Sequence, residues 1–395
     1  MKRKSFILFI ILSFFLFSGC WNYDDLEDLE IVLGVAIDKN LASGNYILTA
    51  EIVNQYQSGG QSEGEESGTT RPGSSSLCVE TTGATIFDAM RNAISKTGKK
   101  LFWGHCKGII ISEEAAKDGI IPILDIFWRD AEVRPDIWII ISHGDDAGAF
   151  LKLKIRSGEL VSDFLNNTIR TDREISTFVK NEMLSFVETL SVKTSSVVAP
   201  AVYAVLENGN FIPEIKGTAV FKKDELKYFL DAEESKIALL IRNELKGGSF
   251  VLDQSSSVDA EHAMRISLEV YDSKVKIKPV LQNDRLIMEI AANLEFSVCE
   301  LGGSENYLEK DLRDMLANHM TAMLESRILA LVQKTKDSYS TDIFGFDQAI
   351  KSAMPDYWKA NREDWDTIYK GLQIIPKVKV TLVLSANTSD TIAIN

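Results

Sequence analysis

Hydrophobic positions form one short apolar run at the start of the chain and then a body of alternating and helix-periodic segments. Residues 6–17 are apolar except for Ser13, and Lys-Arg-Lys stands just before them at residues 2–4. As a helix this run rises about 18 Å, which is too short for a hydrocarbon core of roughly 30 Å. A basic start followed by such a run is typical of a cleavable signal segment.

The apolar run ends in Phe17-Ser18-Gly19-Cys20. Small residues before a cysteine resemble the bacterial lipobox, although Phe17 stands where leucine is usual. We therefore predict a signal peptide at residues 1–19 and lipid modification of Cys20. Two acyl chains, at about 0.8 kcal/mol per buried CH₂, hold a protein on a membrane essentially permanently. An ordinary signal peptide with an incidental Cys20 is the alternative.

The first part of the body predicts a mixed sheet with helices. Residues 30–38 and 45–55 alternate as two strands of a hairpin. Residues 57–76 are rich in Gly, Ser and Glu without any aliphatic side chain, which predicts a mobile loop. The remaining expected elements are strands at 77–82, 106–112 and 136–142, helices at 85–97 and 119–129, a short helix capped by Ser112, and three helical stretches between 145 and 190.

The pattern changes after residue 196. Asn208-Gly209-Asn210 separates two alternating strands, 197–206 and 212–222, which is a hairpin signal. Expected elements beyond this hairpin are a helix at 231–246, strands within 264–299, helices at 305–336 and 356–370, and a strand at 376–386. The long helix carries one apolar stripe of Leu308, Leu312, Met315, Leu316, Met320, Met323, Leu324, Ile328 and Leu331.

Charge changes the picture of what the body can bind. The chain has a net charge of −14, and the signal segment removes only basic residues. Such a body is repelled by phosphates, and no cluster of Lys or Arg interleaved with aromatic residues offsets this. We expect no nucleic-acid binding, and we expect that membrane attachment depends on an anchor and not on charge.

Candidate chemistry is sparse. The histidines are His105, His143, His262 and His319, and none has metal-ligand spacing to another. No nucleophile elbow, phosphate-binding loop or dinucleotide fingerprint occurs. We expect no catalytic residue, no metal and no cofactor. Cys78, Cys106 and Cys299 show no CxxC spacing, and the sequence leaves a Cys78–Cys106 disulfide undecided.

One helical segment combines two aromatic side chains. Trp358, Trp365, Ile368 and Leu372 follow one another at helical spacings, which favours a core face over a binding face. Trp358 and Trp365 are nevertheless the candidates for docking onto a partner, because buried aromatic anchors dominate protein interfaces.

Several segments together resemble one family. They are CW at residues 20–21 followed by DDLEDLEIVLGVAIDK, HCKGIIISEEAAKDGI at 105–120, RDAEVRPDIWIIISHGDDA at 129–147, KGTAVFKKDELKYFLDAEES at 216–235 and DIFGFDQAIKSAMPDYWKA at 342–360. In this order they are similar to the Ger(x)C proteins, the C subunits of spore germinant receptors, which are also called GerAC-like.

The resemblance implies a non-enzymatic, lipid-anchored subunit on the outer surface of the spore inner membrane. It would act beside an A and a B membrane subunit in nutrient-triggered germination. It also implies an α+β fold of three domains, each with a largely antiparallel or mixed sheet and flanking helices. We place these domains at residues 20–196, 197–262 and 263–395, behind the signal peptide.

Two other functions fit an exported lipoprotein. A solute-binding lipoprotein of a transporter needs two similar βαβ lobes, and the strand-rich block followed by one long helix does not favour that arrangement. A lipid-anchored hydrolase has no nucleophile motif in its favour. The receptor subunit is therefore the function that the sequence favours.

Overall fold

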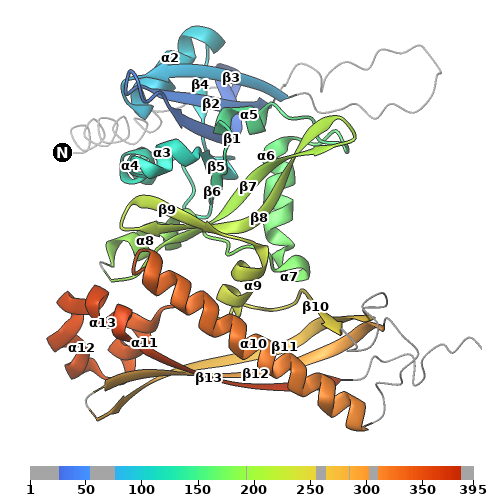
Figure 1. Ribbon diagram of the computed structural model, residues 1–395. Coiled ribbons are helices and arrows are strands. Elements are labelled where there is room, and N and C mark those ends of the chain that lie inside the picture. The colour runs from blue at the N-terminus through green and yellow to red at the C-terminus, as the bar shows by residue number, and fades with distance from the viewer. Residues whose placement is uncertain are drawn as a thin grey trace, which may run out of the picture.

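The computed structural model describes residues 26–53, 76–192, 194–254, 264–283, 285–301 and 310–383, and within them it contains two β-sheets (Figure 1). The larger sheet runs in the order β3-β2-β1-β5-β6-β7-β8-β9, with β4 paired to β1. Its strands are β1 (Leu29–Lys39), β2 (Tyr46–Val53), β3 (Ser76–Gly83), β4 (Lys100–Phe102), β5 (Gly108–Ile111), β6 (Trp138–Ser142), β7 (Val198–Glu207), β8 (Asn210–Lys222) and β9 (Glu225–Leu230).

The larger sheet is mixed. Strands β1, β2 and β3 form an antiparallel meander, which confirms the expected first hairpin. Strands β1, β5, β6 and β7 then pair in parallel. Only helices connect β5 to β6 and β6 to β7 within the described residues, whereas the connection from β1 to β5 contains β2, β3, α2 and β4. Strands β7, β8 and β9 close the other end as antiparallel hairpins. The turn between β7 and β8 has Asn208 and Gly209 at φ 50° and 81°, as its sequence predicts.

Helices cover both faces of this sheet, and its central strand β6 is buried at every position. Ile139 and Ile140 are adjacent in β6, and both are buried, but they enter two different apolar clusters. One cluster holds α2 (Ile86–Thr97), α3 (Glu113–Lys117), α4 (Ile121–Arg129) and α8 (Met183–Ser191). The other holds α5 (Ala147–Leu151) and α6 (Val161–Arg170), which is followed by α7 (Asp172–Ile175).

Local signals position these helices. Gly98 ends α2 in the left-handed region, at φ 71°, as expected. Ser112 accepts the backbone N–H of Ala115 at the start of α3, which confirms the predicted cap. The strand expected from residue 106 begins only at Gly108, so His105 lies in a turn. Strand β9 was not expected, and it fills the interval before Asp231 caps α9 (Ala232–Ile241).

The smaller sheet has the order β10-β11-β12-β13, built from β10 (Ser249–Gln254), β11 (Met264–Gln282), β12 (Arg285–Leu301) and β13 (Gln373–Val383). Strands β11 and β12 form one long hairpin, and β13 returns parallel to β12. The return passes through α10 (Lys310–Ser338), α11 (Phe346–Ala353), α12 (Pro355–Asn361), a 3₁₀ turn (Arg362–Asp364) and α13 (Trp365–Gly371).

Helix α10 lies across one face of the smaller sheet (Figure 1). Its buried stripe is largely as expected and contains Leu316, Met320, Leu324, Ile328 and Leu331. Met315 was assigned to the stripe, but it is 45% exposed. It precedes Leu316 by one residue, and this step turns its side chain about 100° round the helix, away from the sheet.

The expected helix at 356–370 is divided. Pro355 starts α12, and the backbone leaves helical geometry at Asn361, with φ −121° and ψ 0°, before α13 begins at Trp365. The break turns α13 so that Trp365 and Tyr369 are both buried against the core of the smaller sheet.

The mixed sheets with flanking helices that the sequence predicts are confirmed. The boundary proposed after residue 196 falls between α8 and β7, and β7 pairs with β6 inside the larger sheet. The division into three domains stays a prediction. Among the helices in the described ranges, none has both the length and the apolar character that crossing a bilayer requires.

Candidate functional site

A groove of about 410 Å³ runs between the end of α8 and the helices beside the smaller sheet. One wall is the chain that leaves α8. The other wall comes from α11, α12 and the 3₁₀ turn that follows α12. The lining residues are Ser191, Val192, Thr194, Gln348, Lys351, Trp358, Lys359, Arg362 and Glu363.

Trp358 is the large aromatic side chain of this groove. It is half-buried, and its ring meets the ring of Trp365 edge-on at a centroid distance of 5.5 Å. Trp365 is only 3% exposed and contacts Tyr369 at 5.8 Å. The structure therefore brings the two candidate docking residues together, with Trp365 supporting Trp358 from the core side. Such an aromatic pair contributes about 0.5–1.5 kcal/mol beyond its buried area.

The groove is locally basic. Lys351, Lys359 and Arg362 line it together with a single carboxylate, Glu363. Arg362 and Glu363 form an ion pair of 3.3 Å, and both side chains are well exposed, so the pair contributes little to stability. An aromatic ring surrounded by cations suits a partner segment that carries an apolar side chain flanked by carboxylates.

Asp347, next to Gln348 of the groove, links α11 to the segment that connects α8 and β7. Its Oδ2 accepts hydrogen bonds from the hydroxyls of Thr194 at 2.7 Å and Ser195 at 2.6 Å. Its Oδ1 accepts the backbone N–H of Gln348 at 2.7 Å. Asp347 is fully buried, so these donors replace the water that the carboxylate loses.

Asp342 is the second buried carboxylate of this segment, and it fixes the backbone just before and at the start of α11. Its carboxylate accepts the backbone N–H groups of Phe344, Gly345, Phe346 and Asp347, which start α11. Burial, followed by the negative charge of Asp347, raises the pKa of the Asp342 carboxyl to about 7. The carbonyl oxygen of Asp342 also accepts the N–H of Ser196, which is a second link to the segment between α8 and β7.

Sequence reasoning did not single out Asp342 and Asp347. Both lie in the segment DIFGFD, which was used for the resemblance but was given no structural role. Aspartate often accepts the backbone N–H two residues on in an Asx turn, and this local signal could have identified Asp342, which bonds Phe344 in this way. Asp347 could not be found this way, because its partners Thr194 and Ser195 lie more than 150 residues away.

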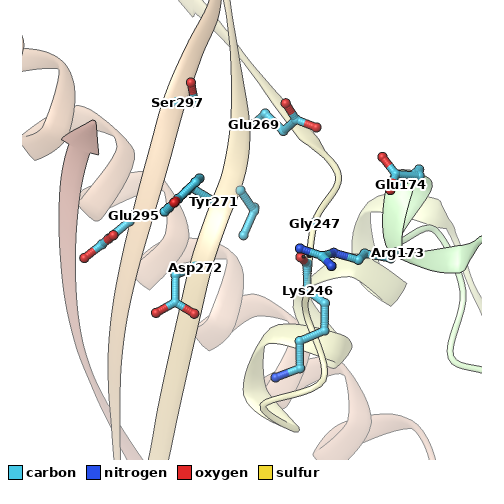
Figure 2. Close-up of a pocket in the computed structure, with 10 residues that line it drawn as sticks. Arg173, Glu174, Lys246, Gly247, Glu269, Tyr271, Asp272, Glu295 and Ser297 are labelled. Atoms are coloured by element: carbon cyan, nitrogen blue, oxygen red, sulfur yellow. Dashed lines mark hydrogen bonds between the residues drawn. The ribbon is translucent and has the colours of Figure 1, made fainter. Parts of the chain in front are cut away.

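A second cavity, of about 510 Å³, separates α7 from the smaller sheet (Figure 2). Arg173 and Lys246 face Glu269, Asp272 and Glu295 across it. Its lining is mostly polar, and Tyr271 beside it is 67% exposed. Charges of both signs are thus spread along a wide, open cleft and do not converge on one point.

The other candidate residues are placed as follows. Cys20 and the 57–76 segment, apart from Ser76 at the start of β3, lie outside the described residues. Cys78, Cys106 and Cys299 are free thiols, and burial raises the pKa of Cys106 to about 12, so it is inert. No group of three or more His, Cys, Asp or Glu side chains within the described ranges could hold a metal ion.

The protein thus consists of two parts, each built on one sheet. The buried carboxylates of Asp342 and Asp347 lie where the two parts meet. Residues 22–203 match the family model of the spore germination protein N-terminal domain. Residues 216–385 match the model described as spore germination B3/GerAC like, C-terminal. The chain belongs to the GerAC-like family of spore germination proteins, the C subunits of germinant receptors, as the sequence resemblance indicated.

Similar proteins occur in Bacillus subtilis (strain 168). Spore germination protein KC is 26% identical, over 93% of this chain and 92% of its own length. Spore germination protein B3 is 24% identical, over 93% of each chain. A solved structure, the crystal structure of the GerBC protein, has a TM-score of 0.53 at 20% identity and covers 89% of this chain and 97% of that chain. This structure supports the fold.

Proposed function

We propose that this protein is a non-enzymatic, lipid-anchored subunit of a spore germinant receptor that acts by docking onto the membrane A and B subunits. The family supports the receptor role. Neither matched family model nor the names of the relatives describe an enzyme. The anchor would be the lipid on Cys20, at the outer surface of the spore inner membrane.

The observation that carries the docking proposal is the groove around Trp358. A partly exposed tryptophan, held in place by a buried one, is the kind of anchor that dominates interface energies. Cations surround it in a chain whose net charge is −14. A lipid anchor would confine the protein to the membrane surface, where even a modest interface gains from a high effective concentration.

A germination assay with two tryptophan variants tests this proposal. Trp358→Ala should abolish or strongly slow nutrient-triggered germination, because it removes the anchor but leaves Trp365 in the core. Trp128→Ala is the matched control, since Trp128 is 44% exposed on α4 and does not line the groove. Normal germination with Trp358→Ala, at normal protein level, would contradict the docking site.

The anchor is tested separately by acyl labelling. Cys20→Ala should abolish incorporation of labelled palmitate and release the protein from the membrane or mislocalise it. Unchanged incorporation in the variant would show that another residue, or none, carries lipid.

The alternative, a solute-binding lipoprotein, predicts ligand binding by the body itself. The two sheets differ in strand number and order, so within the described residues they do not form two similar lobes. Under the docking proposal, calorimetry of the purified protein with germinant amino acids and sugars shows no heat. Saturable micromolar binding would instead assign a sensor role and point to the open cleft of Figure 2.

A further inference from the structure

The face of the smaller sheet that α10 leaves open carries a concentration of lysines. Strand β11 presents Lys274, Lys276 and Lys278, and β13 presents Lys377 and Lys379, all of them exposed. Alternate residues of a strand point to one face, so the three lysines of β11 share a face, as do the two of β13. We call these five residues the lysine face.

The strand register brings both sets together across β12. Lys276 pairs with Ala291, which pairs with Lys377. Lys274 pairs with Asn293, which pairs with Lys379. Directly opposed residues in neighbouring strands lie on the same side of a sheet. Two rows of the sheet therefore each have a lysine at both ends and a small, uncharged residue between them.

Ion pairs neutralise two of these five lysines. Lys274 pairs with Asp272 at 2.6 Å, and Lys377 pairs with Glu289 at 2.7 Å. Lys276, Lys278 and Lys379 form no ion pair with any residue that the structure describes. Glu289 lies among the lysines, opposite Lys278 in the strand register. Other carboxylates of this side, Glu269, Asp272 and Glu295, border the cleft of Figure 2. The outer face thus has one end where carboxylates gather and another where lysines outnumber them.

The rest of the chain does not cancel the lysine face at close range. The chain has a net charge of −14, but charges in solvent are largely screened beyond a Debye length of about 8 Å at physiological salt. A flat anionic surface in contact with the sheet would therefore experience the lysines first. The sequence-based expectation that charge plays no part in membrane attachment treats the body as uniform, and the fold shows that it is not.

The side chains around the lysines do not suit a protein partner. Interfaces between proteins are enriched in aromatic residues and arginine and are depleted in lysine. On β12 the residues beside the lysines are Glu289, Ala291 and Asn293, and none of them is aromatic. Lysine on a flat face, without an anchor, matches the diffuse attraction between basic residues and anionic lipid headgroups.

We propose that the lysine face rests on the anionic phospholipid surface and so orients the body against the membrane to which it is anchored. This inference rests on the membrane anchoring proposed above. Juxtamembrane lysines each strengthen attachment to an anionic leaflet by about fivefold. The lysine face alone would not hold the protein on a membrane; it selects one orientation of a protein that is already tethered.

A fluorophore at the centre of the lysine face tests the orientation. The full chain carries Asn293→Cys for labelling and Cys299→Ser to remove the exposed native thiol. The other free thiols, Cys78 and Cys106, are half-buried and buried. The labelled chain is reconstituted into vesicles of phosphatidylcholine, with or without phosphatidylglycerol, that contain a headgroup-linked quencher. We expect strong quenching only with phosphatidylglycerol, and less quenching as salt is raised.

Charge reversal provides the decisive variants. Lys276→Glu, Lys278→Glu and Lys379→Glu together should shift the orientation equilibrium by more than about 100-fold and remove the quenching. Matched controls change the same net charge elsewhere and should retain it. They are Lys154→Glu, Lys223→Glu and Lys370→Glu, three exposed lysines outside the lysine face.

Each outcome can be assigned. Failure of the chain to float with vesicles contradicts the anchoring, whereas a tethered chain with equal quenching in both vesicle types overturns the lysine-face proposal alone. The label at position 293 could instead become shielded from solvent only when receptor subunits are co-reconstituted, and equally so in neutral vesicles. That result also overturns the lysine-face proposal and assigns this face to a protein partner.

Discussion

The two sheets of this protein are covered to different extents. In the larger sheet, β6 is buried along its whole length, and neighbouring residues such as Ile139 and Ile140 enter cores on opposite faces. In the smaller sheet, β12 alternates, with Leu294 1% exposed under α10 and Asn293 on the open side. The larger sheet is thus an interior layer, and the smaller one has a free surface.

This difference indicates that the larger sheet supports the fold, whereas the smaller sheet offers surfaces for contact with partners. Covering both faces leaves the larger sheet little surface for partners, whereas the smaller sheet offers the lysine face and, beside its helices, the Trp358 groove. The strand edge of the smaller sheet is protected: Pro376 lies on β13, and Glu325 of α10 accepts the N–H of Val378 at 3.1 Å. Edge protection limits unwanted strand pairing and leaves the face as the surface for contact.

The comparison of the two sheets is tested first by alanine substitutions at adjacent strand positions, for which we expect the largest changes in the free energy of unfolding. Ile139→Ala and Ile140→Ala should each lower the free energy of unfolding by about 2–5 kcal/mol, because both side chains fill cores. In β12, Leu294→Ala should cost a similar amount, but Asn293→Ala should change it by less than about 0.5 kcal/mol. Denaturant unfolding measures all four. A large loss for Asn293→Ala would show that the smaller sheet is covered on both faces.

Removing the carboxylate that links the two regions should have the next largest effect. Asp347→Ala leaves the hydroxyls of Thr194 and Ser195 without their acceptor, which should cost about 2–3 kcal/mol. Asp356→Ala, at an exposed site on α12, is the control and should be close to neutral. Equal melting temperatures for the two variants would mean that the link does not stabilise the joint.

The buried pair should also make stability depend on pH. Because the folded state raises the pKa of Asp342 to about 7, well above an unfolded value of about 3.9, the folded protein binds this proton more tightly. Its stabilising contribution is complete below about pH 4 and is lost as pH rises to about 7. Relative to Asp342→Asn, the native protein should lose stability across that window. A constant difference between the two proteins from pH 4 to 7 would contradict this assignment.

Excising residues 58–75 should have the smallest effect. Val53 of β2 and Ser76 of β3 are paired, so the four residues that remain, 54–57, span the gap as a short hairpin loop. Loop-closure entropy changes only slowly with length, so we expect a melting temperature within a few degrees of the native value. A loss of several kcal/mol in thermal unfolding would show that the excised segment packs against the body.

Local signals predicted most of the elements. Alternation gave β1 and β2, Gly98 and Ser112 marked helix boundaries, and Asn208-Gly209 marked a turn. Each of these depends on residues near one another in the sequence. The short strand β9 and the break at Asn361 were missed, because tertiary packing decides both.

The candidate site was predictable only in part. The sequence identified Trp358 and Trp365, but their separation into a groove residue and a buried support depends on the break in the helix. The lysine face was missed for a different reason. The segments KVKIK and KVK are about 100 residues apart, and only the register through β12 places them on one surface.

The most direct test of the docking account is photocrosslinking from the groove in the spore inner membrane. A photoreactive residue at Lys351, which lines the groove beside Trp358, should form a cross-link to the A or B receptor subunit. The same residue at Lys154, exposed on the larger-sheet side, should not. Cross-links to these subunits from position 154 and none from position 351 would contradict docking through the groove.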